Sequence, residues 1–294
     1  MSTRIHVIGV GKMGLPMALH FLAAGHGVSV SDPSSERLDL ARTQGLAVAG
    51  DAAAAISEAE VIFSSLPNDA ALLAVAQQVA ASARLGSTFV DSSTVSQQAS
   101  AGAAALCKAA GLHYLRTTVS GNNKMAEAAQ LTVMASGPRP AYDALLPVLR
   151  LLGPHQFYLG EAEQARLMKL VVNLMIAQTS AMLAEGLTLG RQGGLDWRDM
   201  WQVLGASAVA SPILKAKAVQ LSERDFTPTF TVGQMIKDLD LILRAGAAVH
   251  APLAQTALTQ QLMHAALAQG DGQEDYAAII KTVERSAGLS SDLV

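Results

Sequence analysis

The sequence has few of the features that bind nucleic acid, form disulfides or keep a chain disordered. Among its 294 residues there is one cysteine, charged residues make up 15%, and the formal net charge at pH 7 is −3. The single cysteine, Cys107, excludes an internal disulfide and a cysteine-based metal cluster, as is typical of proteins from a reducing cytosol. No basic excess is present to attract nucleic acid or an anionic membrane surface. We therefore expect a cytoplasmic protein with no metal site and with neither nucleic acid nor a membrane as its partner.

Long uninterrupted apolar runs are also missing, although 50% of the residues are hydrophobic. Lys169 and Asn173 interrupt the longest such run, so we expect no segment of membrane-spanning length. The N-terminus leads directly into a β-rich run with glycines, which is unlike a signal peptide. The length leaves room for one large or two moderate globular domains with substantial cores.

The N-terminal residues follow the order strand, glycine-rich turn, helix, strand and acidic residue. These segments are Ile5–Ile8, Gly9–Gly14, Leu15 to about Ala24, Val28–Ser31 and Asp32. The GxGxxG motif alone is weak evidence, but here it follows a strand, opens a helix and is followed by an acidic residue within one βαβ unit. This context predicts a dinucleotide-binding fold.

Each glycine of the motif has a physical reason to be there. Gly9 permits the tight turn, Gly11 lets the backbone approach a pyrophosphate, and Gly14 lets helix and sheet pack closely. The N-terminus of the following helix then offers N–H donors to the anion. Asp32 would accept from the ribose hydroxyls and repel a 2′-phosphate, which favours NAD over NADP, although Arg37 is close enough to leave NADP open. The alternative is a structural glycine turn with a surface aspartate.

Two further predicted strands end in polar loops. Val61–Ser65 leads into the loop 66–68, and Thr88–Asp91 leads into the loop 92–96. An open parallel sheet binds ligands beyond the carboxyl ends of its strands, so we expect both loops to face the cofactor. Ordinary polar connections are the alternative. After a strand at His113–Leu115 we predict a turn of small polar residues over 117–123.

Beyond Glu161 the pattern changes to helices only. One long helix is predicted from about Ala162 to Gln192, and shorter helices follow. We therefore predict an α/β Rossmann-like N-terminal domain, residues 1–161, and an all-α C-terminal domain for substrate binding and oligomerisation, residues 162–294, joined by a long interdomain helix. A long apolar helix is hard to cover within one small domain, so we expect a homodimer or homotetramer.

The helical run Ala165–Asn173 carries an ammonium and an amide four residues apart, at Lys169 and Asn173, with Arg166 near the same stripe. Residues at i and i+4 lie on one face of a helix. Apolar surroundings favour the neutral amine, which makes a lysine a better base near neutral pH. The alternative is a lysine whose stem packs at a domain seam while its ammonium reaches water.

In their order along the chain, these motifs resemble the β-hydroxyacid dehydrogenase family, which includes 3-hydroxyisobutyrate dehydrogenase, tartronate semialdehyde reductase and L-threonate dehydrogenase. The resemblance runs nearly from end to end, and residues 131–137 and 272–275 are most similar to the threonate dehydrogenase subgroup. The matching segments are residues 9–18 for the cofactor fingerprint, 66–68 and 91–94 for two cofactor loops, 119–121 for the substrate loop, 169 and 173 for the catalytic helix, and 237–239 for the C-terminal signature.

The resemblance implies an oxidoreductase that uses NAD, or alternatively NADP, to interconvert a small β-hydroxy acid and its semialdehyde or keto acid. It implies that Lys169 is the general acid/base and that Asn173 positions the substrate or the lysine. The implied substrate-binding residues are Ser120, Gly121, Asn122 and Lys237. The implied cofactor-binding residues are Gly9, Gly11, Lys12, Met13, Gly14, Asp32, Leu66, Pro67, Asn68, Thr94 and Lys237. For Lys237, a surface pair with Asp240 is the alternative.

The segment around the substrate loop departs from the family. Relatives usually read Asp-Ala-Pro where this chain has Arg116, Thr117 and Thr118, and they have glycine at the positions of Asn122 and Ala129. We expect these departures to lie on the substrate side, where Asn122 narrows the pocket and adds a hydrogen-bonding group that would also suit a sulfonate. Repacking without altered specificity is the alternative.

Two other functions fit parts of the pattern. Imine reductases and reductive aminases have sequences of similar architecture but usually lack the lysine. A non-catalytic dinucleotide-binding protein is expected to keep the glycines and lose the lysine. Because this chain has both the glycines and Lys169, the pattern favours the dehydrogenase over either alternative.

Overall fold

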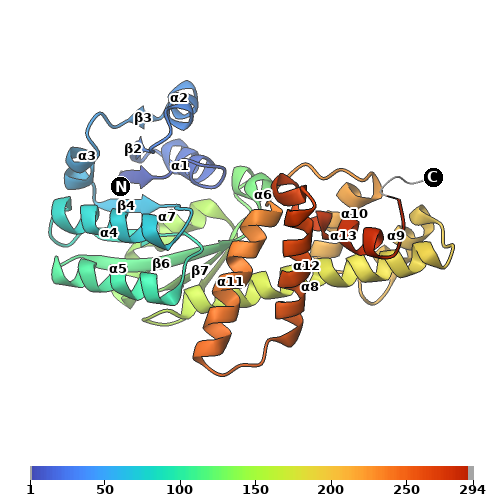
Figure 1. The fold of residues 1–294 in the computed structure, drawn as a ribbon. Helices are drawn as coiled ribbons and strands as arrows, with labels where there is room; N and C mark the ends of the chain where they lie inside the picture. Colours follow the sequence, from blue (N-terminus) through green and yellow to red (C-terminus); the bar gives the residue numbers. More distant parts are fainter. Residues whose placement is uncertain (1, 291–294) are drawn as a thin grey trace. The chain divides into compact units, whose positions relative to one another are not determined.

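A computed structural model describes residues 2–290 of the chain (Figure 1). These residues fall into two compact units, one that ends at Lys169 and one that begins at Leu170. The first unit is a sheet with helices against both faces, and the second consists of helices. The predicted fold class, a Rossmann-like α/β region followed by a helical region, is confirmed.

Within residues 2–290, the strands of the first unit form one eight-stranded sheet in the order β3-β2-β1-β4-β5-β6-β7-β8. Neighbouring strands are parallel throughout, except that β7 runs antiparallel to β6. The chain goes from β1 to one side of the sheet and returns to β4 on the other, so the carboxyl ends of β1 and β4 flank the switch point where such sheets bind ligands. The strands are β1 (Arg4–Ile8), β2 (Gly27–Ser31), β3 (Ala47–Val48), β4 (Val61–Ser64), β5 (Thr88–Asp91), β6 (His113–Ser120), β7 (Thr132–Ser136) and β8 (His155–Tyr158).

The helices of the first unit cover the two faces of this sheet. Because successive strand residues point to opposite faces, Val7 of β1 lies in one core and Ile8 in the other. The helices α1, α2, α6 and α7 contribute to the first core, and α3, α4 and α5 to the second. Figure 1 shows α4 and α5 side by side. The helices are α1 (Gly14–Ala23), α2 (Ser35–Thr43), α3 (Ala52–Glu58), α4 (Asp69–Ser82), α5 (Gln97–Ala109), α6 (Asn123–Glu127) and α7 (Arg139–Leu149), followed by the 3₁₀ turn η1 (Arg150–Leu152).

Parts of the first unit differ from the sequence-based expectation. The elements α2, α3 and β3 were not predicted; α2 buries one side chain, Ala41, and so carries a weak amphipathic signal. Residues 117–120 were expected in a turn, but β6 continues through them because they pair with β7, where Thr117 lies opposite Ala135. Such pairing depends on a partner distant in sequence, which local composition does not reveal.

The second unit is built from helices around one core. The long helix α8 (Gln164–Gln192) begins in the first unit and, from Leu170 onward, contributes residues such as Ala177, Ala184 and Leu187 to this core. The other elements are α9 (Trp197–Ala206), α10 (Pro212–Ser222), α11 (Val232–Ala248), α12 (Ala254–Ala268), the 3₁₀ turns η2 (Asp271–Gln273) and η3 (Tyr276–Ala278), and α13 (Ile279–Ser286).

The expectation that no segment reaches membrane-spanning length is wrong for α8. This helix has 29 residues and contains an 18-residue window of mean hydropathy 1.5, so by length and composition alone it could cross a membrane. The core helix of a globular protein passes the same test. Because α8 supplies several side chains to the core of the second unit, its apolar character has a packing explanation.

The buried His6 of β1 predicts a pH dependence of stability. Its ring nitrogens lie 2.8 Å from Ser29 Oγ and 3.0 Å from Ser31 Oγ, and burial lowers the pKa of His6 to about 4. The unfolded ring has a pKa of about 6.5, so between these values the unfolded state binds a proton that the folded state does not. We expect the free energy of unfolding to fall as the pH is lowered from about 6.5 to 4.

This prediction is checked by urea unfolding at a series of pH values. The variant His6→Gln cannot take up the proton and should lose that part of the slope, whereas the exposed His113→Gln should keep it. Equal slopes for the wild type and His6→Gln would contradict the prediction.

Candidate functional site

The glycine-rich turn lies between β1 and α1, at the carboxyl edge of the sheet. Gly9 has φ +90°, and a Cβ on it would lie 2.4 Å from Ser65 O. A Cβ on Gly14 would lie 1.9 Å from Gly9 O, whereas nothing lies within 4 Å of the place of a Cβ on Gly11. Gly9 and Gly14 are therefore required by the turn and its packing, while the backbone at Gly11 is open to a ligand.

The N-terminus of α1 is suited to an anion. Its N-cap residue, Met13, gives no side-chain cap. In its first turn, Leu15 N donates to Gly11 O at 3.1 Å and Pro16 has no N–H. The helices α2 to α5 all have side-chain caps, from Ser34, Asp51, Asn68 and Ser96. An uncapped helix start beside the open backbone of Gly11 fits the pyrophosphate of a dinucleotide.

Asp32 is held beside this turn. It follows β2, and its carboxylate accepts hydrogen bonds from Val10 N and Ser34 N, each at 2.8 Å. Each carboxylate oxygen has a second lone pair that can accept from a ribose hydroxyl. Asp32 therefore combines a structural role with the position expected for recognition of the ribose.

The two polar loops after β4 and β5 lie at the same edge of the sheet and are joined to each other. Leu66 N donates to Ser93 Oγ at 2.8 Å. Asn68 begins α4, because its Oδ1 accepts from Ala71 N at 3.0 Å. Pro67 and Thr94 belong to the same two loops, so the structure brings the predicted cofactor residues of the first unit to one edge.

The predicted substrate loop follows β6, which ends at Ser120. Gly121 has φ +136°, and a Cβ on it would lie 2.6 Å from Leu131 Cδ2, so a larger residue would be strained. Asn122 uses its Oδ1 to accept from Met125 N at 3.0 Å and thereby caps α6. Sequence reasoning missed this cap, although an asparagine directly before a helix is its usual signal.

The three residues before this loop, which were expected on the substrate side, lie inside the sheet. Arg116 is 5% exposed, and Thr117 and Thr118 are fully buried. Arg116 pairs with Glu163 and lies over the Tyr114 ring, 4.7 Å from its centroid. Thr118 Oγ1 donates to the backbone oxygen of Ala165 at 3.0 Å. These side chains hold the start of α8 against the sheet.

Ala129, where relatives have glycine, has a backbone conformation that favours glycine. Its φ is +53°, in the left-handed region. We expect Ala129→Gly to raise the free energy of unfolding by about 0.5–1 kcal/mol, because relief of the strained backbone outweighs the added freedom of the unfolded chain. Urea unfolding measures this. The matched variant Ala128→Gly, at φ −86°, should not stabilise, and a destabilised Ala129→Gly would contradict the prediction.

Lys169 lies in the second turn of α8 and belongs to the first unit, together with the glycine turn and the cofactor loops. Three residues before it, Arg166 is 1% exposed and forms an ion pair with Asp91, whose side chain is fully buried. Arg166 also donates to Ser93 O at 2.5 Å, Tyr114 Oη at 3.0 Å and Ser100 Oγ at 3.1 Å. Burial raises the pKa of Tyr114 to about 12, so it stays a neutral phenol.

Burial opposes the charged form of Arg166, but Tyr114 and Asp91 outweigh it and hold the pKa of Arg166 above the ordinary arginine value. Sequence reasoning missed Asp91 as a partner of this helix. Two signals were available: an arginine in an apolar helical run, and an aspartate at the end of a buried strand.

In the second unit, the side chains of Asn173 and Lys237 both contact the carboxylate of Asp238. Asn173 Nδ2 donates to Asp238 Oδ2, and Lys237 Nζ lies 2.8 Å from Asp238 Oδ1. Asp238 is 1% exposed and was not predicted as a site residue, although it lies in the motif 237–239. The surface partner suggested for Lys237, Asp240, accepts a hydrogen bond from Gln260 Nε2 at 2.6 Å.

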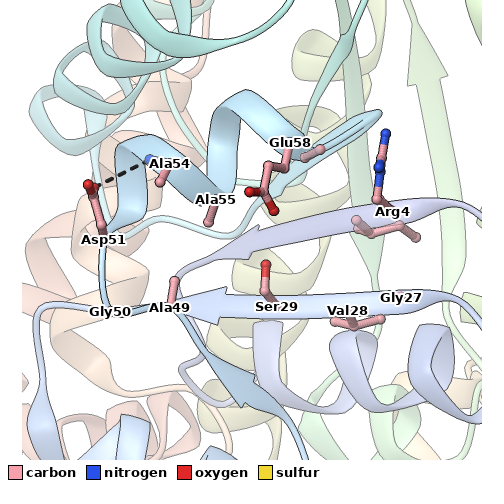
Figure 2. A pocket seen from close by; sticks show the side chains of 12 residues that line it. Arg4, Gly27, Val28, Ser29, Ala49, Gly50, Asp51, Ala54, Ala55 and Glu58 are labelled. Carbon is pink, nitrogen blue, oxygen red and sulfur yellow. Dashed lines mark hydrogen bonds between the residues drawn. The ribbon is translucent and has the colours of Figure 1, made fainter.

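A pocket of about 480 Å³ lies at another place in the first unit (Figure 2). Its lining includes Arg4 of β1, Ser29 of β2 and Glu58 of α3. Arg4 is the first residue of β1 and Ser29 the middle residue of β2, and the lining continues to residues 49–51, between β3 and α3. No predicted site residue lines it, so this pocket is separate from the candidate site.

Comparisons with known proteins cover nearly the whole chain. The sequence model of the NAD binding domain of 6-phosphogluconate dehydrogenase matches residues 4–160, and that described as NAD-binding of NADP-dependent 3-hydroxyisobutyrate dehydrogenase matches residues 164–283. The chain is 32% identical to 2-(hydroxymethyl)glutarate dehydrogenase from Eubacterium barkeri over 98% of this chain and 97% of that one.

Two further relatives also match over nearly the full length of both chains. Glyoxylate/succinic semialdehyde reductase 1 from Arabidopsis thaliana is 28% identical over 95% of this chain and 98% of its own. The solved structure of 3-hydroxyisobutyrate dehydrogenase from Mycobacterium tuberculosis with L-serine matches with a TM-score of 0.89 and 28% identity, over 96% of this chain and 99% of that one.

Proposed function

Because the chain belongs to the β-hydroxyacid dehydrogenase family of NAD(P)-dependent oxidoreductases, we propose that it interconverts a small β-hydroxy acid and its semialdehyde or keto acid, with Lys169 as general acid/base. One observation carries the proposal. Arg166, three residues before Lys169 on α8, pairs with Asp91 and donates to Ser93 O of a predicted cofactor loop, at the same sheet edge as the open glycine turn. We assign cofactor binding to residues 1–161 and substrate binding with self-association to residues 162–294.

The proposed chemistry follows from the side chains present. The bound nicotinamide supplies the hydride acceptor or donor. Lys169 Nζ takes the hydroxyl proton of the substrate as the hydride leaves the same carbon, because otherwise an unstable cation would form, and it returns that proton in reduction. Ser120 Oγ and the N–H of Gly121 bind the substrate carboxylate, and Asn122 lies beside them.

The roles of Asn173 and Lys237 rest on their match to the family motifs. We propose that Asn173 orients the substrate or the lysine and that Lys237 contacts both substrate and cofactor. Within the second unit, Asp238 supports both assignments, since it accepts from Asn173 Nδ2 and pairs with Lys237 Nζ. A buried carboxylate that holds two polar side chains fixes their orientation.

We propose NAD as the preferred cofactor, on the basis of Asp32, and a cytoplasmic enzyme without a metal, nucleic-acid or membrane partner. We also propose a homodimer or homotetramer. Support comes from a groove of about 420 Å³ between α8 and α12, whose lining includes Met175, Met182 and Leu258. These three side chains are more than half exposed, at 63%, 55% and 59%. A monomer in sedimentation at micromolar protein would contradict the proposed assembly.

A screen by nicotinamide absorbance tests the proposed reaction. It would offer three- and four-carbon β-hydroxy acids, sulfonated analogues, 2-(hydroxymethyl)glutarate, glyoxylate, succinic semialdehyde and cyclic imines, each with NAD and with NADP. Turnover of a β-hydroxy acid or its carbonyl product is the expected result. Turnover of imines alone would favour an imine reductase, and cofactor binding without any turnover would favour a non-catalytic protein.

A further inference from the structure

Arg166 is the deeply buried charge next to Lys169 in the first unit. It is 1% exposed, whereas the two residues that follow it, Leu167 and Met168, are 41% and 39% exposed. From Arg166 to Lys169 the helix rises about 4.5 Å, less than one turn. Because a helical turn is stiff, the position at which Arg166 is bound also sets the position of the Lys169 backbone.

Asp91 connects Arg166 to both predicted cofactor loops. Its Oδ2 accepts from Arg166, while its Oδ1 accepts from Ser64 Oγ and from Ser93 Oγ, the latter at 2.6 Å. Ser93 Oγ in turn accepts from Leu66 N at 2.8 Å. A continuous chain of hydrogen bonds therefore runs from the turn that carries Lys169 to the loops 66–68 and 92–94.

Stability alone is a weak reason for such a pair, since apolar residues of similar volume often stabilise a core as well as a buried ion pair does. A guanidinium, however, donates in a fixed planar fork, and its four bonding partners in this structure accept it in one orientation. We propose that Arg166, acting through Asp91, is a positioning residue for Lys169: the pair sets the place of the lysine relative to the cofactor loops. This inference rests on the proposed function of Lys169.

The test compares Arg166→Met with a matched variant elsewhere. Arg166→Met is expected to lower kcat about 10²-fold, the cost of a displacement of about 1 Å at a reacting group. Glu284→Gln is the control: Glu284 is fully buried in the second unit, where it pairs with Arg191 at 2.6 Å and Arg224 at 2.8 Å. It should lower the melting temperature and leave kcat unchanged below that temperature.

A double-mutant cycle separates positioning from general stabilisation. If Arg166 acts through Lys169, then Arg166→Met should cause no further loss of kcat in a Lys169→Ala background. An unchanged kcat in Arg166→Met, or an equal loss with and without Lys169, would overturn the proposal. Should Arg166→Met fail to fold, Arg166→Lys keeps the charge without the fork and is expected to lose about tenfold in kcat.

A readout that does not need turnover keeps this inference distinct from the proposed function. With lysines isotopically methylated, the NMR signal that disappears in Lys169→Ala reports on the surroundings of that side chain. It should shift in Arg166→Met and not in Glu284→Gln. If no substrate is found in the screen, the proposed function fails while this comparison still decides the positioning role, and an unshifted signal overturns it.

Discussion

Replacing Lys169 by alanine is expected to lower kcat by about 10²–10⁴-fold, the usual contribution of a general acid/base, while the protein stays folded and still binds the reduced cofactor. The physical reason is that the alcohol proton and the hydride leave the same carbon group nearly together. The cofactor residues lie elsewhere in the first unit, in the glycine turn and the two loops, so the binding of NADH should change little.

Single-turnover and steady-state kinetics with a substrate from the screen would measure this loss. The matched control is Lys108→Ala, which removes an exposed lysine from α5 in the same unit and should leave kcat at the wild-type value. Added ethylamine should restore part of the activity of Lys169→Ala and none of that of the control, because it returns a base to the vacated position. Wild-type turnover by Lys169→Ala would contradict the assignment.

The second large effect concerns the choice of cofactor. The wild type is expected to prefer NAD over NADP by about 10²-fold in kcat/KM, because a 2′-phosphate beside a carboxylate costs several kcal/mol and each 1.4 kcal/mol is about tenfold. Asp32→Asn should reduce this preference at least about tenfold, chiefly by lowering KM for NADP. Asparagine keeps one oxygen to accept from Val10 N or Ser34 N, the two bonds that hold Asp32.

Steady-state kinetics with both cofactors would check the expected switch. Asp39→Asn is the matched control, since it removes the same charge from an exposed position on α2 that pairs with Arg42, and it should leave the preference unchanged. Equal use of NAD and NADP by the wild type, or an unaltered ratio in Asp32→Asn, would show that Asp32 does not select the cofactor.

Several features of the candidate site could be predicted from the sequence because they are local. The glycine turn is one such feature. Gly9 has a positive φ, and Gly14 has no room for a Cβ because Gly9 O, five residues earlier, lies too close. The helices α9, α11 and α13 of the second unit are another, because the period of their apolar residues identifies them. The placement of Lys169 and Asn173 on one helix face could be predicted for the same reason, because it depends only on their spacing in the sequence.

What the tertiary structure decided involves residues that are far apart in the sequence. The partner of Arg166 is Asp91, 75 positions away, and the carboxylate that holds Asn173 is Asp238, 65 positions away. Residues 117–120 became strand because β7 pairs with them, and Arg116 turned inward to Glu163.

The sequence by itself therefore determined the fold class, the family, the NAD(P) cofactor and the candidate lysine. Only the packed structure decided which buried charges meet and which departures from the family face the core. The reason is physical: periodicity and turn chemistry act within a few residues, whereas a buried polar side chain must find its partner on whichever element packs against it.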